Sequence, residues 1–250
     1  MPSRRPLVLF DWGDTLMVIP GMLNTPSAHL ECARRAFAEP LAARLSAHGR
    51  PIDAGQVVSA YAIASREEIE RSQATAREHA FEDRFARTLG LIDRAGAVNG
   101  EGLTEFAQAL AAQVVGQAVL VEGAMEAVQR LAQRFRLGIV SNYPMASVVR
   151  RSLARFNLED AFECIAVSGS SGWLKPHPNA FRAALDSLAL DGAPAVFIGD
   201  DLENDVRGGK RMGMRTIWYA PGRPTPEEPD LDFHAHSLGE IPAWCERNVH

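Results

Sequence analysis

The stretch LVLFDWGDTL, residues 7–16, joins an apolar run to two carboxylates. Four consecutive apolar residues that end at a turn are typical of a buried strand, so we predict a strand over residues 7–11. Asp11 ends that strand, and Asp14 follows it across Gly13. An aspartate at a turn often only caps the backbone. Whether these carboxylates take part in chemistry therefore has to be judged from residues elsewhere in the chain.

Beyond residue 120, further apolar runs alternate with helical patterns. The predicted strands cover residues 137–140, 164–167, 195–199 and 215–220, with a shorter strand near Phe233. The predicted helices begin at Pro144 and near Pro178, cover Glu203–Arg211, and include a last helix near Ile241. Strands that alternate with helices indicate an α/β fold with a doubly wound parallel sheet, Rossmann-like in its arrangement.

The segment that precedes residue 120 has a different character. From about Asn24 to Gln117 it is rich in Ala, Arg, Glu and Gln, and it keeps a helical pattern without a convincing strand. Breaks at Gly49-Arg50-Pro51 and Val98-Asn99-Gly100 interrupt the pattern, and the segment is typical of a bundle of about four helices. We therefore predict two domains: a core of residues 1–17 and 120–250, and an inserted helical bundle of residues 18–119.

Composition narrows the class of protein. Of the 250 residues, 46% are hydrophobic and 23% are charged, with a net charge of −5. This balance is ordinary for a soluble enzyme and argues against nucleic acid or an anionic membrane as a partner. No apolar run reaches the roughly 18 residues of a membrane helix, and the start MPSRRP lacks the pattern of a signal peptide. Cys32, Cys164 and Cys245 are too far apart for a zinc site or a disulfide framework, which favours a cytoplasmic location.

Polar residues follow the ends of the predicted strands, and this edge of a doubly wound sheet is where ligands bind. Ser141 and Asn142 follow the second strand, where they either cap the next helix or hold a phosphate at its N-terminus. Lys175, within GWLKPHP, precedes another predicted helix. Because Lys210 is the only other lysine of the chain, the place of Lys175 favours a functional role over a merely exposed one.

An acidic segment follows the strand at 195–199. FIGDDLENDVRGG, residues 197–209, carries four acids: Asp200, Asp201, Glu203 and Asp205. Such a loop is often simply solvated. Four neighbouring carboxylates repel one another, however, unless a cation lies among them, and hard oxygen ligands suit Mg²⁺.

In this order and at these strand ends, four segments resemble those of the haloacid dehalogenase-like hydrolase superfamily, most of whose members are phosphatases. The segments are LVLFDWGDTL (7–16), LGIVSN (137–142), LKPHP (174–178) and FIGDDLENDVRGGKRMGM (197–214). The resemblance covers residues 5–17 and 120–240. The inserted bundle stands where the superfamily places a cap domain, which would close over the site and select the substrate.

The resemblance implies a Mg²⁺-dependent phosphatase that acts on a small phosphorylated metabolite. Asp11 would attack the phosphorus and form an aspartyl-phosphate. Asp11, Asp200 and the backbone carbonyl of Gly13 would hold Mg²⁺. Ser141, the amide of Asn142, and Lys175 would bind the phosphate. Asp205 and Asp201 would support these groups without contacting the phosphate, Asp205 by orienting Lys175 or the metal waters.

The first segment departs from the commonest superfamily pattern, Asp-x-Asp-Gly-Thr. Gly13 stands where the second Asp serves as general acid and base, and the carboxylate comes one residue later, at Asp14. Adjacent side chains in an extended turn point in different directions, so we expect Asp14 to bond amides of the turn or of the cap hinge rather than to replace the missing catalyst.

Two further functions stay open on the sequence. One is a dehalogenase-type hydrolase of carbon–halogen bonds, a branch that lacks the second Asp but also typically lacks the Gly-Asp of residues 199–200. The other is a slow or non-catalytic protein that binds a phosphorylated ligand. Phosphonate cleavage is set aside, because its superfamily mechanism needs a cap lysine and residues 18–119 contain none.

Overall fold

The computed structural model describes residues 5–19, 26–47, 51–93, 97–188, 195–228 and 231–249. The chain separates into two compact units. The first comprises Met1–Val18 together with Val119–His250, and the second comprises Ile19–Ala118.

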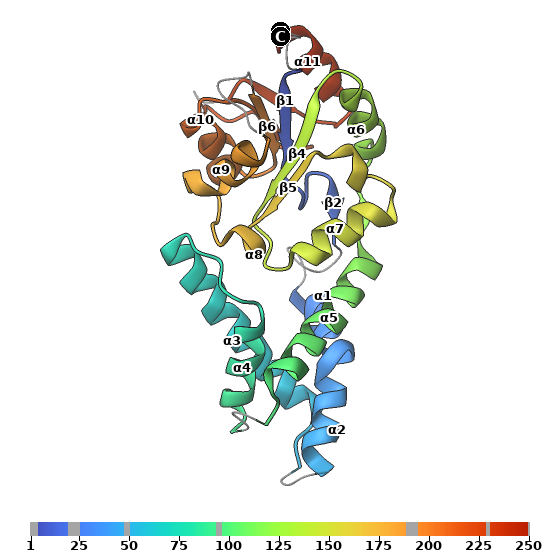
Figure 1. Ribbon diagram of the computed structural model, residues 1–250, viewed down its shortest axis with the longest axis vertical. Coiled ribbons are helices and arrows are strands. Elements are labelled where there is room, and N and C mark those ends of the chain that lie inside the picture. The colour runs from blue at the N-terminus through green and yellow to red at the C-terminus, as the bar shows by residue number, and fades with distance from the viewer. Residues whose placement is uncertain are drawn as a thin grey trace. The chain divides into compact units, whose positions relative to one another are not determined.

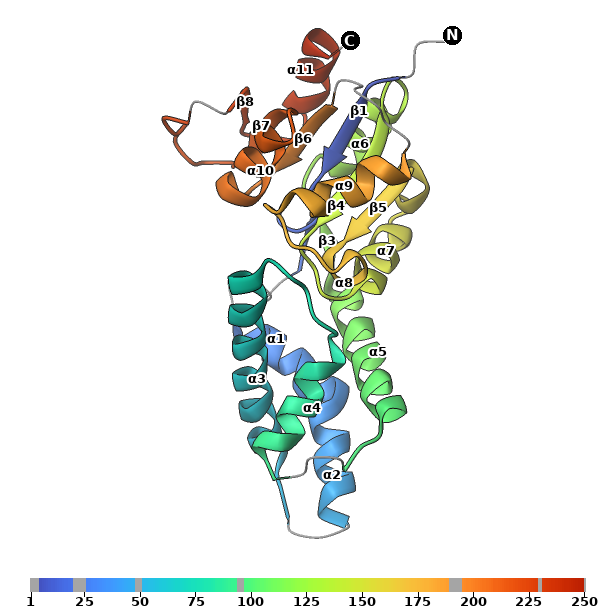
Figure 2. The same ribbon diagram turned by 60° about the vertical axis from the view of Figure 1, so that its left-hand side comes forward.

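The first unit is built on a six-stranded sheet in the order β5-β4-β1-β6-β7-β8, and all its strand pairs are parallel (Figures 1 and 2). Its strands are β1 (Leu7–Phe10), β4 (Arg136–Ser141), β5 (Cys164–Val167), β6 (Ala195–Gly199), β7 (Arg215–Tyr219) and β8 (Phe233–Ala235). Numbered along the chain within the sheet, this is the order 3-2-1-4-5-6 of a doubly wound Rossmann-type fold. The predicted fold class is confirmed.

Helices cover both faces of this sheet (Figures 1 and 2). They are α6 (Ala124–Ala132), α7 (Ala146–Arg155), α9 (Pro178–Ser187) and α10 (Gly208–Arg211), with α11 (Glu240–Asn248) near the end of the chain. The short segments are η2 (Glu159–Ala161), α8 (Ser168–Ser171) and the π-helical η3 (Leu202–Arg207). Helix α9 packs against β4 and β5, whereas α6 packs against β4 and α7 against β5.

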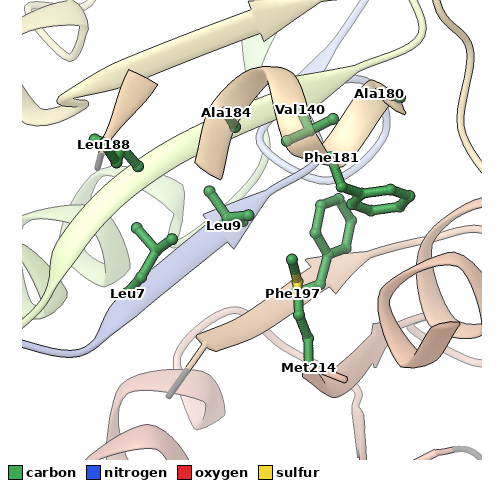
Figure 3. Close-up of a cluster of buried hydrophobic side chains, with 9 residues drawn as sticks. All are labelled: Leu7, Leu9, Val140, Ala180, Phe181, Ala184, Leu188, Phe197 and Met214. Atoms are coloured by element: carbon green, nitrogen blue, oxygen red, sulfur yellow. The ribbon is translucent and has the colours of Figure 1, made fainter. Parts of the chain in front are cut away.

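Alternate residues of the central strands bury one face of the sheet under α9. Leu7 and Leu9 of β1 meet Phe181 of α9 and Phe197 of β6 in a single apolar cluster (Figure 3). The rings of Phe181 and Phe197 pack edge to face, with centroids 5.2 Å apart. Because side chains alternate along a strand, Val8 and Phe10 lie on the opposite face, and they too are fully buried. Burial on both faces explains why these strands are continuous apolar runs.

The second unit is helical throughout the part that the structure describes. A run from α1 (Pro26–Ala33) through the π-helical η1 (Arg34–Ala38) to α2 (Glu39–Ala47) is followed by α3 (Ala54–Thr75), α4 (Glu82–Leu91) and α5 (Gly100–Gln117). Asp53 caps α3 in a reciprocal capping box with Gln56, and Asn99 caps α5. Rings of Phe37, Tyr61 and Phe85 form its aromatic centre.

Several predicted boundaries need correction. Helix α7 begins at Ala146 rather than at Pro144. The helix predicted over Glu203–Arg211 is a π-helical turn, η3, that continues into α10. A two-residue antiparallel pair, β2 (Met17–Val18) with β3 (Val119–Leu120), had no counterpart in the prediction. The predicted helix start at Asn24 and the break at Gly49-Arg50 lie outside the described residues.

Candidate active site

The strand order brings Asp11 and Asp200 to the same point of the sheet. They follow β1 and β6, which are parallel neighbours, and the order in which successive strands are added to the sheet reverses between these two strands. Ligands bind at this switch point in open α/β sheets, because the loops on either side diverge and leave a crevice. The amide of Asp11 donates to the carbonyl of Ile198 at 2.8 Å, which extends the ladder to the nucleophile position predicted from the sequence.

Lys175 bridges two carboxylates at this edge. Its Nζ donates to Asp11 Oδ1 at 2.8 Å and to Asp205 Oδ1 at 2.7 Å, and its side chain is only 2% exposed. The ammonium also lies 5.2 Å from the centroid of the Phe197 ring. Burial alone would disfavour the charge, but Asp11 and Asp205 outweigh it and hold the pKa of Lys175 above its ordinary value. Lys175 is therefore a fixed cation beside Asp11.

The loop after β6 is folded around Asp205. The buried carboxylate of Asp205 accepts from Lys175 through one oxygen and from the amide of Asp201 at 3.0 Å through the other. Asp201 accepts from the amide of Asn204 and so caps η3. A Cβ on Gly199 would lie 2.2 Å from Asp205 Oδ2, so only glycine permits this approach. Asp205 and Asp201 thus shape the surroundings of Lys175 and Asp200.

Three carboxylates crowd together with one lysine between them. Oxygen atoms of Asp11, Asp200 and Asp205 all lie within 4.8 Å of one another. Burial, followed by the charges of Asp11, Asp205 and Asp14, raises the pKa of Asp200 to about 8. A divalent cation would relieve this repulsion, and the all-oxygen donor set fits Mg²⁺. Because Asp205 is already bonded to Lys175 and to an amide, Asp11 and Asp200 are the carboxylates that could hold the ion.

Ser141 and Asn142 end β4 beside β1, on the same edge. Ser141 is buried. The side chain of Asn142 bonds the backbone of Lys175 twice: Nδ2 donates to its carbonyl at 3.0 Å, and Oδ1 accepts from its amide at 2.7 Å. Asn142 therefore fixes the Lys175 loop through its side chain, a contact the sequence had not indicated. Phosphate binding by Ser141 and by the backbone amide of Asn142 stays a prediction.

In the turn after Asp11, the residue with an unusual backbone conformation is Asp14. Asp14 has φ of 52°, in the left-handed region, and its amide donates to the carbonyl of Met17 at 2.8 Å. No described residue donates a hydrogen bond to its half-buried carboxylate. A structural role for Asp14 through amides of the turn or of the cap hinge stays a prediction. Burial and the charge of Asp11 raise the pKa of Asp14. At Gly13, a Cβ would meet nothing within 4 Å.

Two tryptophans support the site and were missed by the sequence reasoning. The indole of Trp12 donates to Ser152 Oγ at 3.2 Å, and the indole of Trp218 donates to the backbone carbonyl of Asp200 at 2.7 Å. Trp12 stands inside the first segment, between two residues that were singled out. Nothing in the sequence around Trp218 indicates a role at the site, because only the pairing of β6 with β7 brings Trp218 close to Asp200.

Comparison with known proteins decides the family. A family model for haloacid dehalogenase-like hydrolases matches residues 6–213. The chain belongs to the haloacid dehalogenase-like hydrolase family. The match includes the inserted helical unit as well as most of the sheet, which agrees with the resemblance found in the four segments.

Individual relatives of this hydrolase match it over shorter stretches. It is 35% identical over 104 residues to the glyceraldehyde 3-phosphate phosphatase of Pyrococcus abyssi, covering 41% of this chain and 43% of that protein. It is 33% identical over 93 residues to the phosphoserine phosphatase of Thermus thermophilus, covering 37% of each. The chain thus spans about half, or less, of the length of the curated relatives it matches.

Solved structures extend the likeness over nearly the whole hydrolase chain. A 2-haloacid dehalogenase from Pseudomonas syringae pv. Tomato DC3000 matches with a TM-score of 0.69 and 22% identity, over 97% of this chain and 99% of that one. At this identity the match shows a shared fold. Among the described residues, no helix is both long and apolar enough to span a membrane.

Proposed function

We propose that this hydrolase is a Mg²⁺-dependent phosphatase that cleaves a small phosphate monoester through an aspartyl-phosphate on Asp11. The observation that carries the proposal is the position of Lys175, buried between Asp11 and Asp205 and beside Asp200, a further carboxylate that could ligate a metal ion. Such a cation neutralises the charge that accumulates when a carboxylate meets a phosphate dianion. The phosphatase names of the sequence relatives support the same class of substrate.

The first chemical step is attack by one carboxylate oxygen of Asp11 on the phosphorus. The new O–P bond forms as the bond to the leaving oxygen breaks, and the substrate alcohol departs with a proton from solvent. Water then attacks the phosphorus of the aspartyl-phosphate, releases inorganic phosphate and restores the Asp11 carboxylate. Lys175 donates to Asp11 throughout and keeps the carboxylate in the orientation required for attack.

Mg²⁺ held by Asp11, Asp200 and the carbonyl of Gly13 would supply charge neutralisation between the carboxylate and the phosphate. Ser141 and the amide of Asn142 would donate to phosphate oxygens, since Ser141 ends β4 and Asn142 follows it, at the edge that carries Asp11. With Gly13 in place of an acid/base Asp, neither the leaving oxygen nor the attacking water has a dedicated carboxylate. We therefore infer that turnover favours substrates with good leaving groups. The inserted helical unit is the part we propose to select the substrate.

The test is a phosphate-release screen over sugar phosphates, nucleoside monophosphates, phospho-acids and an activated aryl phosphate, with Mg²⁺ and with EDTA. We expect Mg²⁺-dependent release that Asp11→Asn abolishes without loss of the fold. A halide-release assay on 2-haloacids runs beside it. Halide release without phosphate release would replace the proposal with dehalogenation. Ligand-induced thermal stabilisation without either product would identify a binding protein instead.

The two lysines of the chain provide a matched control. Lys175→Ala should reduce phosphate release by at least about a hundredfold, because it removes the only cation bonded to Asp11 among the described residues. Lys210→Ala should leave release within about twofold, because Lys210 is partly exposed and pairs with Asp232. Equal effects of the two substitutions would contradict the role of Lys175.

A further inference from the structure

The backbone of Asp200 has one short anchor on its carbonyl side. The indole nitrogen of Trp218 donates to the Asp200 carbonyl at 2.7 Å, across the pairing of β6 with β7 that places Gly199 beside Trp218. The side chain of Asp200 is held less closely, because its nearest bond is from Thr15 Oγ1 at 3.5 Å, beyond the usual length of an O–H···O hydrogen bond.

Trp218 is itself held by its packing neighbours. It is 3% exposed and packs with Val206 of η3 and Ala220 in a small apolar cluster. On β8, His234 lies in register with Trp218, and their ring centroids are 4.6 Å apart. His234 is bonded in turn to Thr225 Oγ1 at 2.8 Å and to the carbonyl of Ala220 at 3.1 Å. The indole N–H therefore has little freedom to point elsewhere.

Repulsion makes such an anchor necessary. Oxygens of Asp11, Asp200 and Asp205 gather within 4.8 Å, and Lys175 contacts Asp11 and Asp205. Asp200 is thus the carboxylate of the three that Lys175 does not contact among the bonds described above, and the charge of its neighbours tends to turn it away. A restraint on the backbone of Asp200 keeps its carboxylate directed at the cluster before any cation binds. Less conformational entropy is then lost when the cation binds.

We propose that Trp218 is a positioning residue for the metal ligand Asp200, and that its indole N–H sets the affinity of the site for Mg²⁺. The proposal rests on the Mg²⁺ site of the proposed function. Groups that orient metal ligands from behind typically change metal affinity by about 10- to 100-fold when they are removed. Trp218 bonds the backbone carbonyl of the proposed metal ligand Asp200. Loss of this hydrogen bond should therefore weaken Mg²⁺ binding rather than slow the chemical step.

The experiment measures Mg²⁺ binding by calorimetry on the full chain without substrate. Trp218→Phe keeps an aromatic ring and removes the donor, and we expect about tenfold weaker Mg²⁺ binding. In assays of phosphate release, the Mg²⁺ concentration for half-maximal rate should rise by the same factor, while kcat at saturating Mg²⁺ stays within about twofold. Trp244→Phe is the control, because this buried tryptophan stacks on Phe233 in the same unit and should leave Mg²⁺ affinity unchanged.

A second variant separates the hydrogen bond from packing. Replacing Trp218 by benzothienylalanine preserves the shape of the bicyclic ring and removes only the N–H, so the fold should be kept even if Trp218→Phe is poorly folded. Wild-type Mg²⁺ affinity in this variant overturns the proposal, whatever Trp218→Phe does. A wild-type protein that binds no Mg²⁺ in calorimetry overturns the metal-dependent function instead, so the two failures are distinct.

Discussion

At the scale of single residues, the turn after Asp11 carries Gly and Asp in the opposite order to the commonest pattern of the family. That pattern, Asp-x-Asp-Gly-Thr, has its glycine at the position of Asp14, and here Asp14 adopts the left-handed conformation with φ of 52°. Aspartate tolerates this conformation better than most residues, at some energetic cost. The position of the pattern's glycine is thus held here by a residue that tolerates the left-handed conformation, and the carboxylate comes one residue later than in the pattern.

Exchanging the two residues tests this account. Gly13→Asp with Asp14→Gly keeps composition and charge, and a Cβ at position 13 meets nothing within 4 Å. General acid/base catalysis contributes about 10²–10⁴-fold, so we expect the exchange to raise phosphate release at least about tenfold. Relief of the left-handed aspartate should also add about 1 kcal/mol to the free energy of unfolding. Steady-state kinetics and urea unfolding measure the two effects.

Asp14→Gly alone is the matching control. It should gain the stability but change turnover by only a few-fold, because Asp14 occupies the glycine position and not that of the catalyst. A loss of turnover in the range of about 10²–10⁴ for this variant would make Asp14 the displaced general acid and base. It would also remove our reason for the preference for good leaving groups.

Residue identity had indicated most of the candidate site before the structure. Asp11 and Asp200 were recognisable because each is a charge at the end of an apolar run, and the sheet gathers such ends. Lys175 was recognisable as one of two lysines in the chain, and Asp205 as part of the acidic segment that follows the strand at 195–199. The hydrogen bonds of Asn142 and Trp218 could not be predicted, because their partners depend on loop paths and strand register that no local sequence pattern encodes. The catalytic roles of all these residues stay predictions.

At the scale of elements, the strands were the easiest to predict. The central strands are buried on both faces, so they are apolar throughout and stand out from the helices. The segment Leu202–Arg207 was harder, because its π-helical turn follows from tertiary contacts: Asp205 faces Lys175 while Gly208 and Gly209 allow close packing. The pair β2–β3 is only two residues long on each side, too short for any periodicity.

At the end of β6, Gly199 lies too close to Asp205 to carry a side chain. Gly199→Ala would place a Cβ 2.2 Å from Asp205 Oδ2 and 2.6 Å from Asp205 Cβ, so the strand and η3 must separate. Asp205 is buried and bonded to Lys175, so the displacement breaks that pair, and we expect a loss of about 3 kcal/mol in the free energy of unfolding. Phosphate release should fall at least about tenfold, because Lys175 loses its second carboxylate.

Gly90→Ala is the matched control in α4. A Cβ there meets nothing within 4 Å, and alanine is favoured over glycine within a helix by about 0.5–1 kcal/mol. This variant should therefore unfold at slightly higher urea concentration with unchanged turnover. Wild-type stability and activity of Gly199→Ala would show that Asp205 can move without harm, contrary to the arrangement described for the site.

At the scale of the whole molecule, the acidic cluster couples the free energy of unfolding to pH and to Mg²⁺. Burial and neighbouring acids raise the pKa of Asp200 to about 8, whereas an aspartate in the unfolded chain titrates near about 3.9. Between these values the folded protein holds a proton that the unfolded chain has released. Stability that is present below about pH 4 is then lost as the pH rises through about 8. The raised pKa values of Asp14 and Asp205 act in the same direction.

The metal-free protein in EDTA should therefore become less stable from pH 6 to pH 8, by on the order of 1 kcal/mol per pH unit. Urea unfolding at several pH values measures this slope. Saturating Mg²⁺ should raise stability most at pH 8, because binding at lower pH must first displace the proton. Asp200→Asn should flatten the slope, raise metal-free stability at pH 8 and abolish the gain from Mg²⁺. If the metal-free protein instead became more stable across this range, Asp200 would be ionised without a metal, and the crowding of carboxylates could not be what makes the site bind Mg²⁺.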